Sequence, residues 1–470
     1  MTHKSIIERA VTTNHNEIPV RSQARAKPWE SGSASPLRCA LVGAFFLWVA
    51  TAATRADVVT DWNVAMNAYA APLDAPNGTL IPNVETRVYA MAHIAMLEAI
   101  KEAQSHRHHR NASASPEAAA AQAAHDVLAH EFADGAAAFD ALLASQLAAI
   151  ADGPAKIKGV SMGMEEAAEM LAARANDGSA TADGPYTPGP NPGDYRPTPP
   201  FDGPPFNGFV FDVNWGKVTP FALRRGSQFR APPPYKVTDL DYTFDLNEIK
   251  ALGSLNGAGR TDDQTQLAIF WYESTGLGWN RIARILTAQQ PLDLYGNARL
   301  FAALNTALAD GHIASWDSKF TYNFWRPITA IRFAATDGND LTSADPTWEA
   351  LLLTPAVPDY PSGHAAASAA AATVLIAFFG DENTFTFAST MSAAYPSVGP
   401  RTFHRISDAA KETAISRMLV GIHFRLACTA GYQQGLEVGN WVVKQQDFRQ
   451  GHEDESRSDG ASGHRGHRGH

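Results

Sequence analysis

From residue 57 onward, apolar residues recur mostly every three or four positions, which is the spacing of one helical face. This spacing is clear in segments 85–103, 155–175, 262–289, 297–316, 364–379 and 408–423. Alternation with a period of two, which half-buried strands show, is scarce. The pattern therefore predicts an all-α fold.

Local signals refine this picture. Ser115, Pro116 and Glu117 supply a cap, a first-turn proline and a first-turn acid, so we expect an alanine-rich helix to begin there. Residues 177–206 are instead rich in proline and glycine and predict a long loop. This loop is either a domain linker or a surface loop that wraps a helical core, and we favour the surface loop.

The two ends of the chain differ from the body. Residues 39–53 form an uncharged, mostly apolar run after a basic segment, too short for a membrane span of about 20 residues. Residues 1–56 are therefore interpreted as a leader with a signal peptide, and we expect export to the periplasm or the extracellular space. An uncleaved N-terminal anchor is the alternative. The polar residues 446–470 predict a disordered tail.

Composition limits the classes of protein. The chain has 470 residues, is 45% hydrophobic and 18% charged, and carries a formal net charge of −10. These values suit a soluble globular protein without a membrane span in the mature chain, and they argue against a nucleic-acid binder, which needs a basic face. Only two cysteines, Cys39 and Cys428, are present, which excludes a disulfide framework.

Two cations seven residues apart form the first candidate for a functional site. If residues 316–326 are one helix, Lys319 and Arg326 share a face with Trp316, because seven residues make nearly two turns. Pro327 would end or kink that helix. No acid stands four residues from either cation, so the pair indicates an anion. A solvated basic face is the alternative, and the aromatic neighbours argue against it.

A second candidate is the sequence Pro361-Ser-Gly-His364, which precedes a run of alanines. Ser362 and Gly363 would stand at a helix start, where free backbone N–H groups and the helix dipole attract an oxyanion. His364 could act there as an acid or a base. The alternative is a serine cap beside an incidental histidine.

A third candidate pairs Arg417 with His423. On one helix the two would lie about 120° apart, and the long arginine could still reach a ligand held by the histidine. Gly421 would leave room beside them.

In this order the three segments match Lys-x6-Arg-Pro, Pro-Ser-Gly-His and the first part of Ser-Arg-x5-His-x3-Asp. The set resembles the superfamily that joins type 2 phosphatidic acid phosphatases (PAP2) with vanadium-dependent haloperoxidases. The resemblance extends over roughly 57–445 to the large secreted bacterial haloperoxidase-like branch, through segments such as 87–93, 324–332 and 421–425.

The resemblance implies two packed helical bundles, an N-terminal helical region at 57–235 and a catalytic region at 236–445 that contains the site. It implies that His423 binds vanadate, that Lys319 polarises hydrogen peroxide, and that His364 moves protons. The oxyanion would be bound by the remaining members of the motifs together with the lysine: Lys319, Arg326, Ser362, Gly363, Arg417 and Trp316.

The chain departs from the motif at one position. Ala427 stands where the pattern has an aspartate that orients the last histidine. A histidine without a carboxylate partner loses the control of its tautomer, so phosphohistidine chemistry requires a substitute group. Vanadate binding is less affected, since a backbone carbonyl could orient the ring.

Three functions stay open at this stage. The first is a vanadate-dependent haloperoxidase that uses hydrogen peroxide and a halide, with the halide left open by Val357 near its expected site. The second is a PAP2-type acid phosphatase that cleaves a phosphate ester through a phosphohistidine. The third is a non-catalytic phosphate- or vanadate-binding relative. The sequence also leaves a homodimer open.

Overall fold

The computed structural model describes residues 57–74, 80–105, 113–257 and 259–462. The leader predicted at residues 1–56 lies outside the described residues, so export stays a prediction. Among the described helices, none combines the length and the apolar character that crossing a membrane requires.

The N-terminal part of the described chain is a group of helices. Their bounds are α2 Val58–Ala70, α3 Pro82–Ser105, α4 Pro116–Glu131, α5 Ala136–Ala148 and α6 Pro154–Arg174. The predicted start of α4 is confirmed, because the Ser115 side chain accepts a hydrogen bond from the Ala118 backbone N–H at 3.2 Å.

The C-terminal part adds eight helices and one hairpin within the described residues. The helices are α7 Leu240–Leu252, α8 Asp262–Phe270, α9 Thr275–Gln289, α10 Leu294–Tyr322, α11 Pro327–Arg332, α12 Gly363–Phe379, α13 Ile406–Leu419 and α14 Arg425–Ser462. The hairpin pairs β1 Glu382–Phe387 with β2 Arg401–Arg405 in antiparallel register, with Phe385 opposite Phe403. The predicted all-α architecture of packed helices is confirmed, with this short hairpin as an addition.

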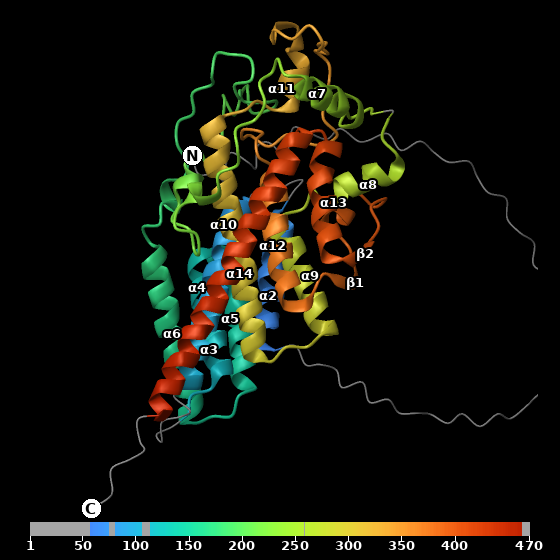
Figure 1. The fold of residues 1–470 in the computed structure, drawn as a ribbon. Coiled ribbons are helices and arrows are strands. Elements are labelled where there is room, and N and C mark those ends of the chain that lie inside the picture. Colours follow the sequence, from blue (N-terminus) through green and yellow to red (C-terminus); the bar gives the residue numbers. More distant parts are fainter. Residues whose placement is uncertain (1–56, 75–79, 106–112, 258, 463–470) are drawn as a thin grey trace, which may run out of the picture.

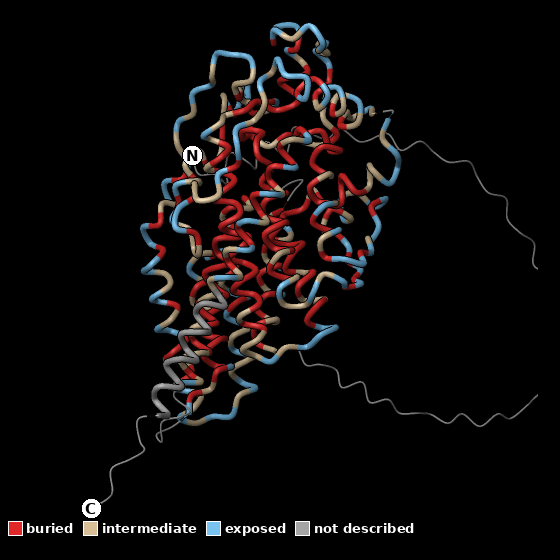
Figure 2. Tube along the Cα trace, viewed as in Figure 1, coloured by how far each residue is buried: buried red, intermediate tan, exposed pale blue. Residues whose placement is uncertain are grey.

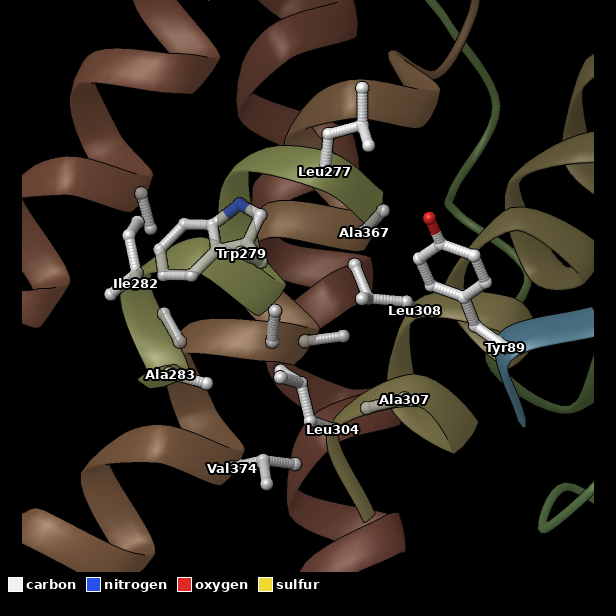
Figure 3. Close-up of a cluster of buried hydrophobic side chains, with 14 of the residues drawn as sticks. Tyr89, Leu277, Trp279, Ile282, Ala283, Leu304, Ala307, Leu308, Ala367 and Val374 are labelled. Atoms are coloured by element: carbon white, nitrogen blue, oxygen red, sulfur yellow. The ribbon is translucent and has the colours of Figure 1, made fainter. Parts of the chain in front are cut away.

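Helix α10 lies in the middle of the molecule and joins the two groups of helices (Figure 1). It packs against α3 on one side and against α12 and α14 on the other. Figure 3 shows this interior, where Trp279 of α9 and Leu304 and Leu308 of α10 meet Ala367 and Val374 of α12. The many alanines of α12 let its neighbours approach closely, and most of α10 and α12 is buried (Figure 2).

The proline- and glycine-rich residues 177–206 form a loop that lies against the end of α10, as the surface-loop interpretation predicts. The Tyr195 N–H donates to the Asn323 carbonyl at 2.8 Å, and the Trp325 N–H donates to the Gly193 carbonyl at 2.8 Å. The loop thereby fixes the chain between α10 and α11, which carries part of the candidate site.

Two boundaries differ from the prediction. The segment 262–289 is two helices, because Ser274 caps α9 by accepting from the Gly276 N–H at 3.2 Å and so starts a new helix. Helix α14 continues to residue 462, past the boundary predicted at 445. No proline follows in that stretch, so nothing in the sequence stops the helix that begins in the packed core.

Candidate active site

Lys319 and Arg326 do not share one helix, contrary to the prediction. Helix α10 ends at residue 322, because Asn323 adopts the left-handed conformation with a φ of 51° and caps it. Arg326 is extended, as residues before proline are, and Pro327 opens α11 at its first position. The chain thus turns back on itself and still brings both cations to the same buried place.

Lys319 is buried in the last turn of α10. Its Nζ donates to the carbonyls of Pro358 at 2.8 Å and of Asp359 at 2.9 Å, and it lies 5.7 Å from the centre of the Trp316 ring. An ammonium group has three protons, so one remains for a ligand. Burial, followed by the nearby Arg326, lowers the pKa of Lys319 well below its usual value.

Arg326 is also buried and holds the turn that follows α13. Its Nε donates to the Val357 carbonyl at 2.7 Å, and its Nη1 donates to the Ile422 carbonyl at 2.7 Å. The same Nη1 lies 3.1 Å from Nε2 of His423. No described residue accepts from Nη2, so part of the guanidinium group is free for an anion.

Helix α12 begins as the sequence predicts. Ser362 is its cap and accepts from the Ala365 N–H at 3.4 Å. No described residue accepts from the backbone N–H of Gly363 or His364, and both groups belong to the positive end of the helix. A Cβ at Gly363 would lie only 2.9 Å from the Trp316 ring, so only glycine allows this close approach.

His364, in the first turn of α12, is a half-buried, neutral histidine. Its Nε2 lies 3.2 Å from the Glu273 carbonyl, and since a carbonyl can only accept, Nε2 carries the proton. Nδ1 therefore keeps a lone pair that can take up a proton. Burial and the neighbouring Arg417 lower the pKa of His364 well below its usual value.

Arg417 and His423 are not on one helix either, which corrects a second prediction. Helix α13 ends at residue 419, and His423 lies in the turn before α14. Gly421 makes this turn with a φ of 89°, and its Cα faces the Gly253 carbonyl, where an added Cβ would lie 2.2 Å away. The glycine therefore makes room for a backbone segment and not for a ligand.

Arg417 is buried in the last turn of α13 and points its guanidinium group over the Tyr272 ring, 5.2 Å from its centre. It donates to one described acceptor, the Trp271 carbonyl, from Nη1 at 3.0 Å. Its Nε has no partner among the described residues although it is fully buried. A guanidinium group has five N–H donors, so most of this one is free for an anion.

Two further members of the site lie outside the three motifs and were not predicted. His312 of α10 is buried, and its Nδ1 has no partner among the described residues. This atom would lie 3.7 Å from a Cβ at Gly363, and the Trp316 ring, whose Nε1 also has no partner among the described residues, would lie 2.9 Å from the same Cβ. Burial, followed by Lys319, lowers the pKa of His312 to about 3. A spacing of seven residues from His312 to Lys319 is the signal that could have found it.

The second missed residue is Asp359, which is fully buried three positions before the cap of α12. Its Oδ1 lies 3.0 Å from Nδ1 of His423 and 4.0 Å from Nη1 of Arg326. Burial raises the pKa of Asp359 to about 7, against the opposing effect of Arg326 and Lys319. Because position 427 is an alanine, the carboxylate that orients His423 has to come from another part of the chain. This was the signal that could have led to Asp359.

Together the described residues place Lys319 and Arg326 beside the buried carboxylate of Asp359, with Arg417 as a third buried cation of the site. Burial lowers the pKa of each cation, because it removes the water that would solvate the charged form. An oxyanion bound among them would supply the missing charge and accept the free N–H donors.

The comparisons agree with this geometry. Residues 299–451 match the family profile of the VCPO second helical-bundle domain. Vanadium chloroperoxidase of Curvularia inaequalis is 29% identical over 184 residues, which are 32% of this chain and 30% of that protein. The match therefore spans less than a third of the length of this curated relative.

Solved structures extend the likeness to both groups of helices. A bacterial vanadium-dependent iodoperoxidase has a TM-score of 0.68 and 25% identity, covering 82% of this chain and 95% of its own. A holo-type bacterial vanadium-dependent chloroperoxidase has a TM-score of 0.63 and 19% identity, covering 78% and 93%, and shows the shared fold alone. These findings show that the described chain has the helical fold of the vanadium-dependent haloperoxidases, and that residues 299–451 match the VCPO second helical-bundle domain.

Proposed function

We propose that this protein is a vanadate-dependent haloperoxidase that oxidises a halide with hydrogen peroxide. The observation that carries the proposal is the group of free, buried N–H donors on three cations beside Nε2 of His423. The reaction would convert hydrogen peroxide, a halide ion and a proton into hypohalous acid and water. The bacterial iodoperoxidase and chloroperoxidase of the same fold support this choice.

The donor set fits a tetrahedral oxyanion. Three buried polar atoms of the site have no partner among the described residues: Nε of Arg417, Nε1 of Trp316 and Nδ1 of His312. Unsatisfied buried donors are costly unless a ligand fills them. Vanadate would therefore be held by these cations and by the start of α12, with His423 Nε2 as the ligand to vanadium.

Bound vanadate would supply a Lewis-acidic centre that activates hydrogen peroxide for oxygen transfer to the halide. The chain would orient and protonate the reactants. Lys319 would keep its third proton for the oxyanion, since the carbonyls of Pro358 and Asp359 accept the other two. His364 would take up a proton at Nδ1 and release it again, because Nε2 already donates its own proton to the Glu273 carbonyl.

The test compares halide oxidation with and without the cofactor. Protein freed of vanadate is assayed with hydrogen peroxide and iodide or bromide, before and after addition of orthovanadate. We expect activity that depends on vanadate and that the His423→Ala variant lacks. No vanadate-dependent oxidation above that variant would contradict the proposal.

A second function, phosphate ester hydrolysis, is favoured by one observation. Asp359 provides a carboxylate beside Nδ1 of His423, which removes the objection raised by Ala427. In this reaction His423 Nε2 would attack phosphorus, the ester P–O bond would break, and His364 would give a proton to the leaving alcohol. Hydrolysis of an aryl phosphate that vanadate inhibits competitively, without halide oxidation, would select this function.

A further inference from the structure

The chain carries the orienting carboxylate of its last histidine on a different segment from the motif. Position 427, in the first turn of α14, is a buried alanine. Asp359, on the segment before α12, is the buried acid nearest to His423. The two segments adjoin, since the Ser362 N–H donates to the Ala427 carbonyl at 2.9 Å. A carboxylate from either segment can therefore reach the same ring.

The two nitrogens of His423 have different nearest neighbours. Nδ1 lies 3.0 Å from Oδ1 of Asp359, and the Arg326 Nη1 donor lies nearer to Nε2, at 3.1 Å, than to Nδ1, at 3.4 Å. A carboxylate accepts and a guanidinium only donates. The arrangement therefore favours one tautomer, with the proton on Nδ1 and the lone pair on Nε2, directed into the group of cations.

The Asp359 carboxylate is held by weak contacts: besides His423, the backbone N–H of Phe424 interacts with it and lowers its pKa. Neither of its carboxylate oxygens makes a well-aligned hydrogen bond to a described residue, although the side chain is fully buried. Its backbone, in contrast, is fixed on both sides, because its N–H donates to the Phe324 carbonyl at 2.9 Å and its carbonyl accepts from Lys319. The backbone thus holds the carboxylate in place for the histidine.

We propose that Asp359 is the positioning residue of His423, and that it replaces the motif aspartate lost at Ala427 by fixing the proton on Nδ1 and the lone pair on Nε2. The inference rests on the proposed role of His423 as the ligand of the oxyanion's central atom. It adds a residue outside the three motifs to the machinery, and it makes Asp359 and Ala427 a coupled pair of positions.

The first test reads the tautomer directly in the free protein. Two-dimensional NMR of protein labelled with 15N-histidine distinguishes a protonated ring nitrogen from an unprotonated one, and the His423→Ala variant assigns the signal. We expect a protonated Nδ1 and an unprotonated Nε2. The opposite tautomer in the wild-type protein would overturn the inference, whatever any variant does.

The second test compares two anions of the same shape, orthovanadate and inorganic phosphate. Vanadium accepts a bond from a histidine nitrogen, whereas phosphate is held by charge and hydrogen bonds alone. In the Asp359→Asn variant, titration calorimetry should show vanadate affinity reduced about ten- to a hundredfold, the usual cost of losing such a partner. Phosphate affinity should stay equal or rise, because a negative charge leaves the site. Equal losses for both anions would mean structural damage and would overturn the positioning role.

A third test moves the carboxylate from position 359 to position 427 and asks whether vanadate affinity is restored. The double variant Asp359→Ala with Ala427→Asp returns the acid to the motif position, and we expect it to recover vanadate affinity to within about tenfold of wild type. The single variant Ala427→Asp should lose thermal stability, since two buried carboxylates would then lie side by side. No recovery in a folded double variant would count against the coupling. Asp212→Asn, which alters a buried carboxylate paired with Asn83 outside the site, is the matched control.

The outcomes separate this inference from the proposed function. If wild-type protein binds vanadate but oxidises no halide, the function fails while both tests of Asp359 stand. If wild-type protein oxidises halide and the ring of His423 has its proton on Nε2, the function stands and the positioning role fails.

Discussion

The buried cations of this site lower the stability of the free protein and favour the binding of an anion. Lys319, Arg326 and Arg417 are all buried within one site, where like charges repel and solvation is lost. Burial lowers the pKa of Arg417 to about 10 although its guanidinium lies over a tyrosine ring. The site is therefore built for a charged ligand at the expense of the free protein.

Replacing Arg417 by methionine separates the two effects. The Arg417→Met variant keeps most of the side-chain volume and removes one of three buried cations, so we expect the free protein to be as stable as wild type or about 1 kcal/mol more stable. Phosphate binding should weaken about ten- to a hundredfold, since charge-assisted hydrogen bonds contribute about 1.5–3 kcal/mol. Thermal unfolding and titration calorimetry measure the two quantities. A variant that loses stability and keeps phosphate affinity would show that Arg417 is structural.

A buried acid outside the site predicts a pH dependence. Burial raises the pKa of Asp212 to about 7, while the same group in the unfolded chain titrates near 3.8. Its contribution to stability is thus fully present below pH 4 and is lost as the pH rises through 7, by about 4 kcal/mol at most. The Asp212→Asn variant stays neutral and can still accept from Asn83. We expect its free energy of unfolding to match wild type near pH 4 and to exceed it at pH 8. Denaturant unfolding at both pH values measures this, and an equal difference at both would contradict it.

At the residue scale the sequence predicted the cations and histidines of the motifs but not their partners. The motifs have fixed spacing, so Lys319, Ser362 and His423 could be found along the chain. Asp359 could not, because its contact with His423 spans 64 positions (359 to 423) and depends on how two turns fold. Long-range contacts of this kind have no periodic signal in one sequence.

At the element scale, two turns outside the helices position the site. The left-handed Asn323 ends α10, and the left-handed Gly421 ends the connection after α13. Both were predicted to lie within longer helices, because hydrophobic spacing continues through them and does not report a positive φ. The helices themselves were predicted well, since their apolar faces are long and periodic, whereas the hairpin at 382–405 was missed because it is short.

The role of the turn at Gly421 can be tested by a substitution that adds one methyl group. An added Cβ would lie 2.2 Å from the Gly253 carbonyl in a left-handed conformation, so Gly421→Ala should cost about 2–4 kcal/mol of stability and weaken phosphate binding. Gly338→Ala is the matched control: its φ is also positive, at 76°, but nothing lies within 4 Å of its Cβ. We expect that control to lose about 1 kcal/mol and to keep its phosphate affinity. Thermal unfolding measures the stability of the two variants, and calorimetry measures their phosphate affinity. Equal losses in Gly421→Ala and Gly338→Ala would contradict the role of this turn.

At the scale of the whole molecule, an acidic chain encloses a cationic site. The formal net charge is −10, yet the site contains three buried cations, Lys319, Arg326 and Arg417. The site joins α10, α12 and the turn before α14, so an anion bound there links elements from across the C-terminal part of the fold. The free protein should therefore be noticeably less stable than the bound one.

This predicts stabilisation by a simple anion. Phosphate at a hundred times its dissociation constant should add about 2.7 kcal/mol to the free energy of unfolding. Thermal unfolding with and without phosphate measures the shift, and sulfate at the same ionic strength shows how much is specific. The shift should shrink in Arg417→Met. An equal shift in that variant would place the phosphate elsewhere.

The central claim is that the buried cations and His423 form one site for vanadate. A crystal structure of protein loaded with orthovanadate, with anomalous scattering recorded at the vanadium edge, tests it most directly. The account predicts a single vanadium peak within bonding distance of His423 Nε2, with its oxygens contacting Lys319 and Arg417. A peak at another place, or no peak at saturating vanadate, would contradict it.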